Sequence, residues 1–179
     1  LDRDPLALLV GMLLDQQVPL ERAFSAPYDL TERLGHELDA RELAGYDPEA
    51  LAALFAQRPA LHRFPAAMAK RVQELCRMLV EQYDGDATGL WNDGASGVEV
   101  RKRLKALPGF GEEKSRIFLA LLGKQYGVQP GGWREAAGPY GPEGTYMSVA
   151  DITDKDSLLQ VRAYKQERKR AAKAGQESG

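Results

Sequence analysis

The sequence predicts an all-α protein built as two helical lobes that share a cleft. Three observations predict this class. Apolar residues recur at helical spacing in several segments, Gly and Pro separate these segments, and residues 104–116 have the pattern of two helices joined by a short Gly/Pro turn. With 179 residues the chain can bury a sizeable core, as one domain or as two small lobes.

The first predicted helix begins after Asp4, a good N-cap residue, with Pro5 at its first position. Its apolar residues mark a buried face: Leu6, Leu9, Val10, Leu13 and Leu14. The segment then changes abruptly to Gln16 and Gln17, and Pro19 ends the helical geometry. Two long amide side chains at a helix end indicate either a contact with a partner or plain solvated capping.

Short helical patterns follow at residues 30–34, 40–43 and 48–55, the second and third each preceded by an Asp that can act as N-cap. The longest amphipathic pattern of the first half spans residues 65–83 and predicts the central buried helix. A turn rich in Asn, Asp, Gly and Ser comes after it and is the best candidate for a lobe boundary. We therefore place the first lobe mainly in residues 1–94.

Residues 95–126 are predicted to form a helix, a tight turn and a second helix. Pro108 stops the first helix, which has a basic wet face, and Gly109 and Gly111 bracket the apolar Phe110. The second helix starts at once, with two acidic residues in its first turn, where they suit the helix dipole. Backbone N–H groups at such a helix start can hold a phosphate oxygen without reading a base. An ordinary αα-turn is the alternative.

Residues 127–147 are predicted to form a long ordered loop, because its aromatic residues need something to pack on and long ordered loops are usually functional. Trp133 and Tyr140 are candidates to line a base pocket, and for Trp133 the alternative is that it ties the loop to the core. A final helix is expected over residues 148–174, with a tail at residues 175–179. Its basic run can touch phosphate or remain solvated.

Charge is unevenly distributed along the chain. The net charge is −2, which argues against a protein that coats nucleic acid by bulk electrostatics. Residues 1–97 nevertheless hold 9 basic and 16 acidic residues, whereas residues 98–124 hold 7 against 3 and residues 155–173 hold 7 against 2. This asymmetry indicates that an anionic partner meets the hairpin and the C-terminal segment. Solvated helix faces remain the alternative for any single Lys or Arg.

Cysteine and histidine content limits the metal chemistry. Cys76 is the only cysteine, so neither an intrachain disulfide nor a four-cysteine iron–sulfur cluster can form. His36 and His62 lack a third ligand at metal spacing, so we expect no metal held by side chains. The apolar run at residues 6–14 is shorter than the roughly 20 residues that cross a bilayer. We therefore expect no membrane contact and a cytoplasmic protein, associated with the nucleoid in a prokaryote.

The turn L-P-G-F-G at residues 107–111, preceded in the chain by the glutamine segment, resembles the helix-hairpin-helix (HhH-GPD) DNA glycosylases of base excision repair. The resemblance covers residues 4–126 and extends to the last helix, and it implies one unit over residues 1–179. It implies a monomer that binds double-stranded DNA and flips out a damaged base, without an iron–sulfur cluster but with a monovalent cation at the hairpin backbone. The residues that it implies for DNA contact are Gln17, Gly109, Phe110, Gly111, Lys114 and Arg116. Gln17 would fill the gap left by the flipped base.

The resemblance implies a catalytic carboxylate, for which the chain offers two candidates. The family places an Asp after the hairpin at a spacing where this chain has Gly131, and no Asp occurs between the hairpin and Asp151. If residues 127–147 are an insertion, Asp151 takes the family position. Glu135 is the alternative, and a plain N-cap role for Asp151 stays open.

The Schiff-base Lys of the family's bifunctional members corresponds to Glu113 here, and Lys114 is one step, about 100°, further round the helix. The resemblance therefore implies a monofunctional glycosylase that uses water. Two alternatives belong to other classes: a non-catalytic DNA-binding module that senses lesions or DNA structure on the same scaffold, and a helical protein-interaction domain.

Overall fold

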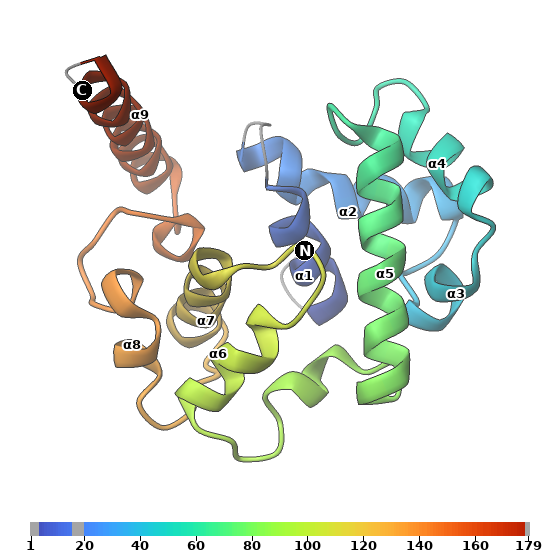
Figure 1. Ribbon diagram of the computed structural model, residues 1–179, viewed down its shortest axis with the longest axis horizontal. Helices are drawn as coiled ribbons and strands as arrows, with labels where there is room; N and C mark the ends of the chain where they lie inside the picture. Colours follow the sequence, from blue (N-terminus) through green and yellow to red (C-terminus); the bar gives the residue numbers. More distant parts are fainter. Residues whose placement is uncertain (1–3, 16–19, 178–179) are drawn as a thin grey trace. The chain divides into compact units, whose positions relative to one another are not determined.

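The computed structural model describes residues 4–15 and 20–177. Within these residues the chain forms helices and no strand, which confirms the all-α prediction (Figure 1). The α-helices are α1 (Pro5–Leu14), α2 (Leu20–Leu34), α3 (Ala40–Gly45), α4 (Pro48–Ala56), α5 (Pro65–Tyr83), α6 (Gly97–Lys105), α7 (Glu112–Gln125), α8 (Trp133–Ala136) and α9 (Lys155–Glu177). Three 3-10 turns join them: η1 (Ala87–Leu90), η2 (Gly138–Tyr140) and η3 (Val149–Asp151). In these parts of the chain, no helix combines the length and the apolarity that crossing a bilayer requires.

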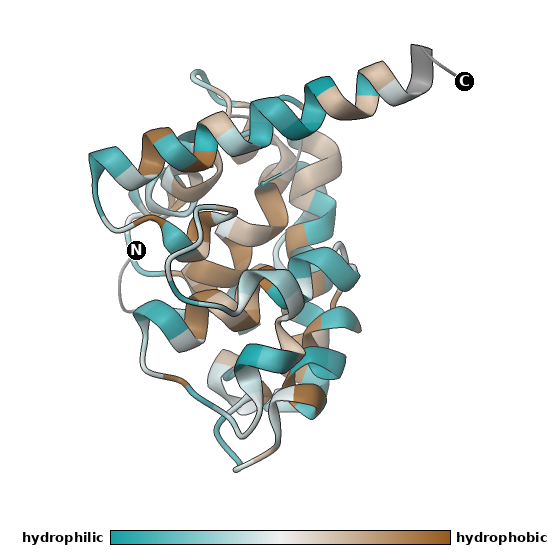
Figure 2. Ribbon diagram, turned by 90° about the vertical axis from the view of Figure 1, so that its left-hand side faces the viewer, coloured by the Kyte–Doolittle hydropathy of each residue, from teal (hydrophilic) through white to brown (hydrophobic). Residues whose placement is uncertain are grey.

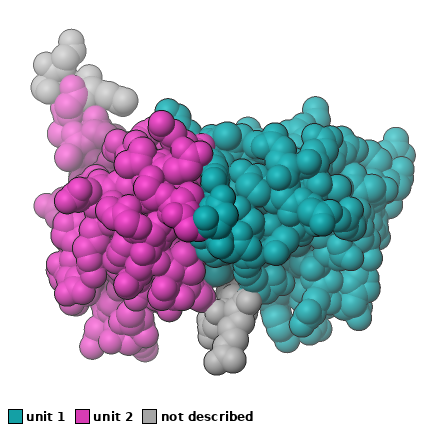
Figure 3. Space-filling view, turned by 90° about the horizontal axis from the view of Figure 1, so that it is seen from below, with its two compact units in different colours: residues 1–93, 103–111 teal, residues 94–102, 112–179 magenta. Residues whose placement is uncertain are grey.

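The chain divides into two compact units, which Figure 3 distinguishes by colour. Unit 1 comprises residues 1–93 and 103–111, and unit 2 comprises residues 94–102 and 112–179. The division falls inside α6, so this helix contributes residues to both units.

The core of unit 1 is formed by α1 and α5. Every residue of α1 from Leu6 to Leu14 is buried, as expected for a helix that is apolar on all sides. The Asp4 carboxylate caps α1 by accepting hydrogen bonds from the N–H groups of Leu6 (3.0 Å) and Ala7 (3.4 Å). Around these helices, α2 packs against α1, and both α3 and α4 pack against α5.

A buried polar contact joins α3 to α5. The Gln73 side chain, on α5, donates hydrogen bonds to the carbonyl oxygens of Leu43 (3.1 Å) and Tyr46 (2.7 Å). These carbonyls lie at the end of α3, where the regular helical hydrogen bonds stop, and the Leu43 oxygen also accepts a longer bond from the Tyr46 N–H (3.4 Å). Gln73 therefore supplies the hydrogen bonds that allow this helix end to be buried.

Helix α2 is longer than the sequence pattern predicts. The pattern indicated a helix only at residues 30–34, whereas α2 begins at Leu20 and continues through Pro27. Ala23, Ala26 and Leu30 recur at helical spacing and are fully buried. Burial of this face stabilises the helix despite the backbone N–H that Pro27 lacks.

In unit 2, Trp133 anchors the segment that follows α7. Its side chain is buried, and a Cβ atom placed on Gly123 of α7 would lie only 2.4 Å from the indole ring. A Cβ atom on Gly97 would lie 2.7 Å from the Trp133 Cα atom, and the Gly97 N–H donates a hydrogen bond to the Gly131 carbonyl (2.8 Å). Two positions without side chains thus let this segment lie directly on α6 and α7.

The helix expected over residues 148–174 is divided into η3 and α9. Asp154 caps α9, because its carboxylate accepts a hydrogen bond from the Ser157 N–H (2.7 Å). In return, the Ser157 hydroxyl oxygen accepts one from the Asp154 N–H (3.0 Å). The hydrogen bonds from Ser157 lower the pKa of the Asp154 carboxyl. Helix α9 then continues into the segment expected to be a tail at residues 175–179.

Candidate nucleic-acid interface

The chain between α6 and α7 forms a type II β-turn. The Phe110 N–H donates to the Leu107 carbonyl (3.0 Å), and Gly109, at the third position of the turn, has φ +79°. Type II turns favour Pro at the second position and require positive φ at the third, which is why Pro108 and Gly109 suit this place. The sequence L-P-G-F therefore specifies the turn.

The two glycines of this turn have different surroundings. A Cβ atom on Gly109 would lie 2.1 Å from a methyl carbon of Leu13, so only glycine fits there. Phe110 and Leu107 are buried and anchor the turn in unit 1. Gly111 is exposed, and a Cβ atom added to it would meet no atom within 4 Å. The turn is therefore held from one side and leaves the backbone at Gly111 open to a partner.

The first turn of α7, in unit 2, carries a cluster of charged side chains. Glu112 forms ion pairs with Arg116 (3.0 Å) and Arg101 (3.8 Å). The Arg101 guanidinium also donates to the Ala136 carbonyl at the end of α8 (3.0 Å). Lys114, in the same turn, is partly exposed. The two arginines offset the negative charge that Glu112 places at the helix start.

Glu113 is held by one residue from η2 and one from α9. Its Oε1 accepts hydrogen bonds from the Tyr140 hydroxyl (2.5 Å) and from Arg168 (3.2 Å). The hydrogen bond from Tyr140, followed by that from Arg168, lowers the pKa of the Glu113 carboxyl. Burial, and then the hydrogen bond to Glu113, raises the pKa of Tyr140 to about 12. The ring of Tyr140, a predicted residue of the base pocket, is thus buried, and its hydroxyl is bonded to a carboxylate.

Asp151 lies in a buried network at the far end of α7. Its carboxylate pairs with Lys124 (2.5 Å) and accepts hydrogen bonds from the Thr145 hydroxyl (3.2 Å) and from the N–H groups of Met147 (2.9 Å) and Ser148 (3.3 Å). Only 4% of its side chain is exposed. The network borders a polar cavity of about 340 Å³ in unit 2. These contacts tie the segment after η2 to α7 and leave the carboxylate oxygens already bonded.

The position of Lys124 along α7 separates Asp151 from the first turn of that helix. Glu113 and Lys124 are 11 residues apart, which corresponds to roughly 16 Å along the helix axis. The predicted catalytic Asp151 therefore lies at one end of α7, and the charged cluster at the other.

The remaining predicted site residues have separate environments. Trp133 is packed on Gly123 beneath the Arg134 guanidinium, 4.5 Å from the ring centre, so its ring is in the core and not open to stack on a base. Glu135 is exposed on α8. Gln17, the predicted residue for the gap in DNA, lies outside the described residues.

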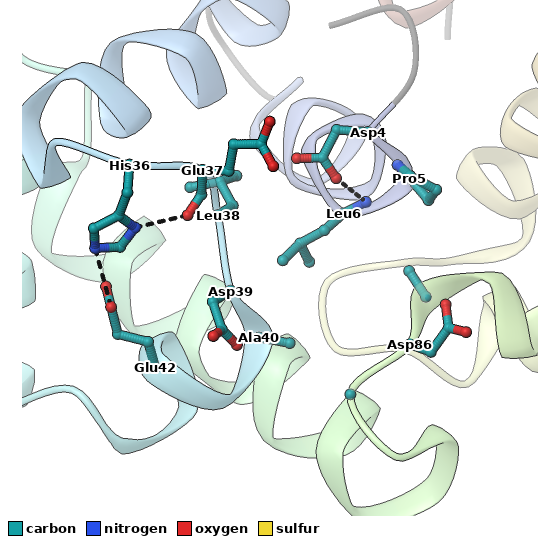
Figure 4. Close-up of a pocket in the computed structure, with 12 residues that line it drawn as sticks. Asp4, Pro5, Leu6, His36, Glu37, Leu38, Asp39, Ala40, Glu42 and Asp86 are labelled. Carbon is teal, nitrogen blue, oxygen red and sulfur yellow. Dashed lines mark hydrogen bonds and ion pairs between the residues drawn. The ribbon is translucent and has the colours of Figure 1, made fainter.

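Unit 1 contains a hollow of about 760 Å³ lined by acidic side chains (Figure 4). Asp4, Asp39 and Asp86 on its wall each cap a helix or 3-10 turn. The His36 ring contacts Glu42 (3.1 Å) and the Glu37 carbonyl (2.8 Å). Across the described ranges no three His, Cys, Asp or Glu side chains are grouped to hold a metal ion. Because these acids repel phosphate, we exclude the hollow as a nucleic-acid site.

The sequence prediction missed the partners of two key carboxylates. Arg168 is 55 residues from Glu113, and Lys124 is 27 residues from Asp151. No motif links residues at such separations. The one available signal was Lys124 itself, a charged residue in the last turn of a helix that is otherwise mostly buried.

Comparison with known proteins identifies one family. A model of the HhH-GPD superfamily of base excision DNA repair proteins matches residues 10–178. No curated protein and no solved structure matches the chain.

Replacement of Asp151 tests the role of the buried pair. We expect Asp151→Ala to lower the free energy of unfolding by about 3 kcal/mol, because it leaves Lys124 charged, largely buried and without its carboxylate. Urea unfolding measures this change. Glu143→Ala is the control, since its pair with Arg134 is largely exposed and should contribute less than about 1 kcal/mol. A loss no larger than the control would contradict the structural role.

Alkaline titration tests the contact between Tyr140 and Glu113. Because the pKa of Tyr140 is raised to about 12, its stabilisation is complete below the ordinary tyrosine value of about 10 and is lost as the pH rises through 12. We expect tyrosinate absorbance to show a late component that Tyr140→Phe removes. Glu113→Gln should move this component to lower pH without abolishing the shift, because burial is the larger cause. An unchanged late component in Tyr140→Phe would refute the assignment.

Proposed function

The chain belongs to the HhH-GPD superfamily of base excision DNA repair proteins, and we propose that it is a monofunctional DNA glycosylase acting on damaged bases in double-stranded DNA. The observation that carries this proposal is the turn at residues 107–111. Its backbone is open at Gly111, and α7 begins at the next residue. Backbone N–H groups at a helix start suit a phosphate oxygen, which gives a grip that does not depend on base sequence.

The side chains of α7 favour hydrolysis over lyase chemistry. A Schiff base needs an amine, and the residue at the corresponding position is Glu113, whose carboxylate is bonded to Tyr140 and Arg168. In hydrolysis, a water oxygen bonds to the sugar carbon as the N-glycosidic bond breaks, the bonding electrons leave with the base, and the water proton ends on the base. A carboxylate near the sugar stabilises the positive charge that develops there.

Of the two carboxylates that the sequence suggested for this role, Glu135 is exposed and Asp151 is not. The oxygens of Asp151 already accept from a lysine, a hydroxyl and two N–H groups. For Asp151 to act on DNA, the segment between η2 and η3 would have to open. We therefore assign the catalytic carboxylate to Glu135 and a structural role to Asp151.

The burial of Asp151 also favours a second candidate. If that carboxylate only ties a loop to α7, the chain can bind DNA through its hairpin without cleaving a glycosidic bond. This candidate is a non-catalytic module that senses lesions or DNA structure. The module and the glycosylase would bind DNA through the same hairpin, and only the glycosylase would break the glycosidic bond.

An assay for base release separates the two candidates. The protein is incubated with duplexes that contain uracil, hypoxanthine, an alkylated base or an oxidised base. We expect strand breaks only after alkali, because a monofunctional enzyme leaves an intact abasic site. Glu135→Gln should abolish release while DNA binding is kept. Strand breaks without alkali would contradict the monofunctional assignment, and binding without release from any duplex would favour the non-catalytic module.

A side chain at Gly111 tests the hairpin grip. We expect Gly111→Val to weaken duplex binding by about tenfold, or about 1.4 kcal/mol, because its side chain occupies the open space beside the backbone. Fluorescence anisotropy measures the binding, and thermal unfolding should be unchanged. Gly131→Val is the matched control, since that position is also exposed and open. Equal affinities for the two variants would disprove the grip at Gly111.

A further inference from the structure

We propose that α9 is a second DNA-binding element, which contacts phosphates through a basic stripe made of Arg162, Lys169, Arg170 and Lys173. The choice of double-stranded DNA as the partner rests on the proposed function. The stripe itself rests on the geometry of α9, and its contribution is separate from that of the hairpin.

The second half of α9 buries no apolar side chain. Near its start, Ser157 and Val161 are buried, whereas the side chains of residues 166–175 are all exposed. Figure 1 shows this half extending beyond the other helices of unit 2, and Figure 2 shows α9 as largely hydrophilic along its length. Packing therefore does not account for the sequence of this half, and its charged surface is accessible to a partner.

Four basic residues of α9 lie along one side of the helix. Successive residues turn by about 100° round an α-helix, so Arg162, Lys169 and Lys173 lie within about 40° of one another, with Arg170 beside them. The acidic Glu167 lies about 140° from Arg162 and about 60° from Arg170, so it borders the stripe only on the side of Arg170. From Arg162 to Lys173 the stripe is roughly 16 Å long, enough to follow several phosphates, since those of one strand are spaced about 3.4 Å apart along the DNA axis.

The contact of Arg168 with Glu113 joins α9 to α7. Arg168 points about 120° away from the centre of the stripe and bonds to Glu113 (3.2 Å) and to the Tyr140 hydroxyl (3.4 Å). The pair attaches α9 to the first turn of α7, the turn that directly follows Gly111 in the chain. Because Arg168 offsets the negative charge of Glu113, this acid at the start of α7 does not simply repel DNA.

Charge complementarity selects the partner. The stripe has no acid among its members, and the chain belongs to a family of DNA repair proteins. A duplex presents a regular row of negative charges that such a stripe can neutralise, with release of counterions. If the stripe instead bound a protein, replacing its basic residues would leave the salt dependence of duplex binding unchanged.

The test is the salt dependence of duplex binding by the full chain. In the stripe variant, Lys169, Arg170 and Lys173 are all replaced by Gln. We expect the slope of log K against log salt concentration to fall by roughly 0.9 for each phosphate that is no longer neutralised, and so by about 2 to 3. The control variant replaces Arg58, Arg63 and Arg77, three exposed basic residues of unit 1, with Gln and should keep the wild-type slope. An equal slope for all three proteins, or an equal fall in both variants, would overturn the proposal.

A second variant, Glu113→Ala, tests the attachment of α9, because the two explanations predict opposite changes in DNA affinity. Loss of an acid should tighten DNA binding if Glu113 only repels phosphate. If Glu113 holds α9 in place through Arg168, Glu113→Ala should weaken binding at least threefold while helical circular dichroism stays unchanged. Tighter binding would overturn the attachment.

The outcomes distinguish this inference from the proposed function. If Gly111→Val shows the expected loss of affinity and the stripe variant keeps the wild-type slope, the DNA-binding role of α9 is overturned and the hairpin grip is supported. If the stripe variant shows a reduced slope and the wild-type protein releases no base from any lesion, the proposed enzyme activity is overturned and the α9 contact is supported. No salt-sensitive duplex binding by the wild-type protein would overturn both.

Discussion

The buried pair of Lys124 and Asp151 is the interaction on which unit 2 depends. Two charges removed from water are stable only when their remaining hydrogen-bonding capacity is met, and here Thr145 and two backbone N–H groups meet it. The pair closes a long segment onto the end of α7. That segment follows η2, whose Tyr140 bonds to Glu113. Arg168 of α9 bonds to the same carboxylate, so contacts at both ends of α7 connect this helix to the chain that follows it.

Net charge is a poor guide to the surface of this protein. Four of the acids in unit 1, Asp4, Asp39, Asp47 and Asp86, cap helices or 3-10 turns, where they stabilise local structure. In unit 2 the acids at the start of α7 are paired with arginines, and the exposed residues 166–175 of α9 include four basic residues and one acid. A chain with a net charge of −2 can in this way present a cationic helix to DNA.

Elements determined by residues close together in the sequence were predicted correctly. Asp4 with Pro5, the amphipathic pattern of α5 and the L-P-G-F turn each determine their structure within a few residues, and each forms as expected. The start of α2 was missed because burial of one face outweighs a proline, which is a tertiary effect. The role of Asp151 was open for a related reason: its helical position fits a cap, but its partner Lys124 is brought to it only by the fold. The geometry of the hairpin turn could be predicted from nearby residues, whereas the hydrogen-bond partners of Glu113 and Asp151 could not.

The path of α6 has a consequence for dissection of the molecule. Because residues 94–102 belong to unit 2 and residues 103–111 return to unit 1, neither unit is a continuous piece of the chain. A truncation after residue 93 would remove the glycine turn from the core that anchors it, and a fragment that begins at residue 112 would lack the start of α6 on which Trp133 rests. If α6 unfolds locally, both units lose part of their structure, because this helix contributes residues to each.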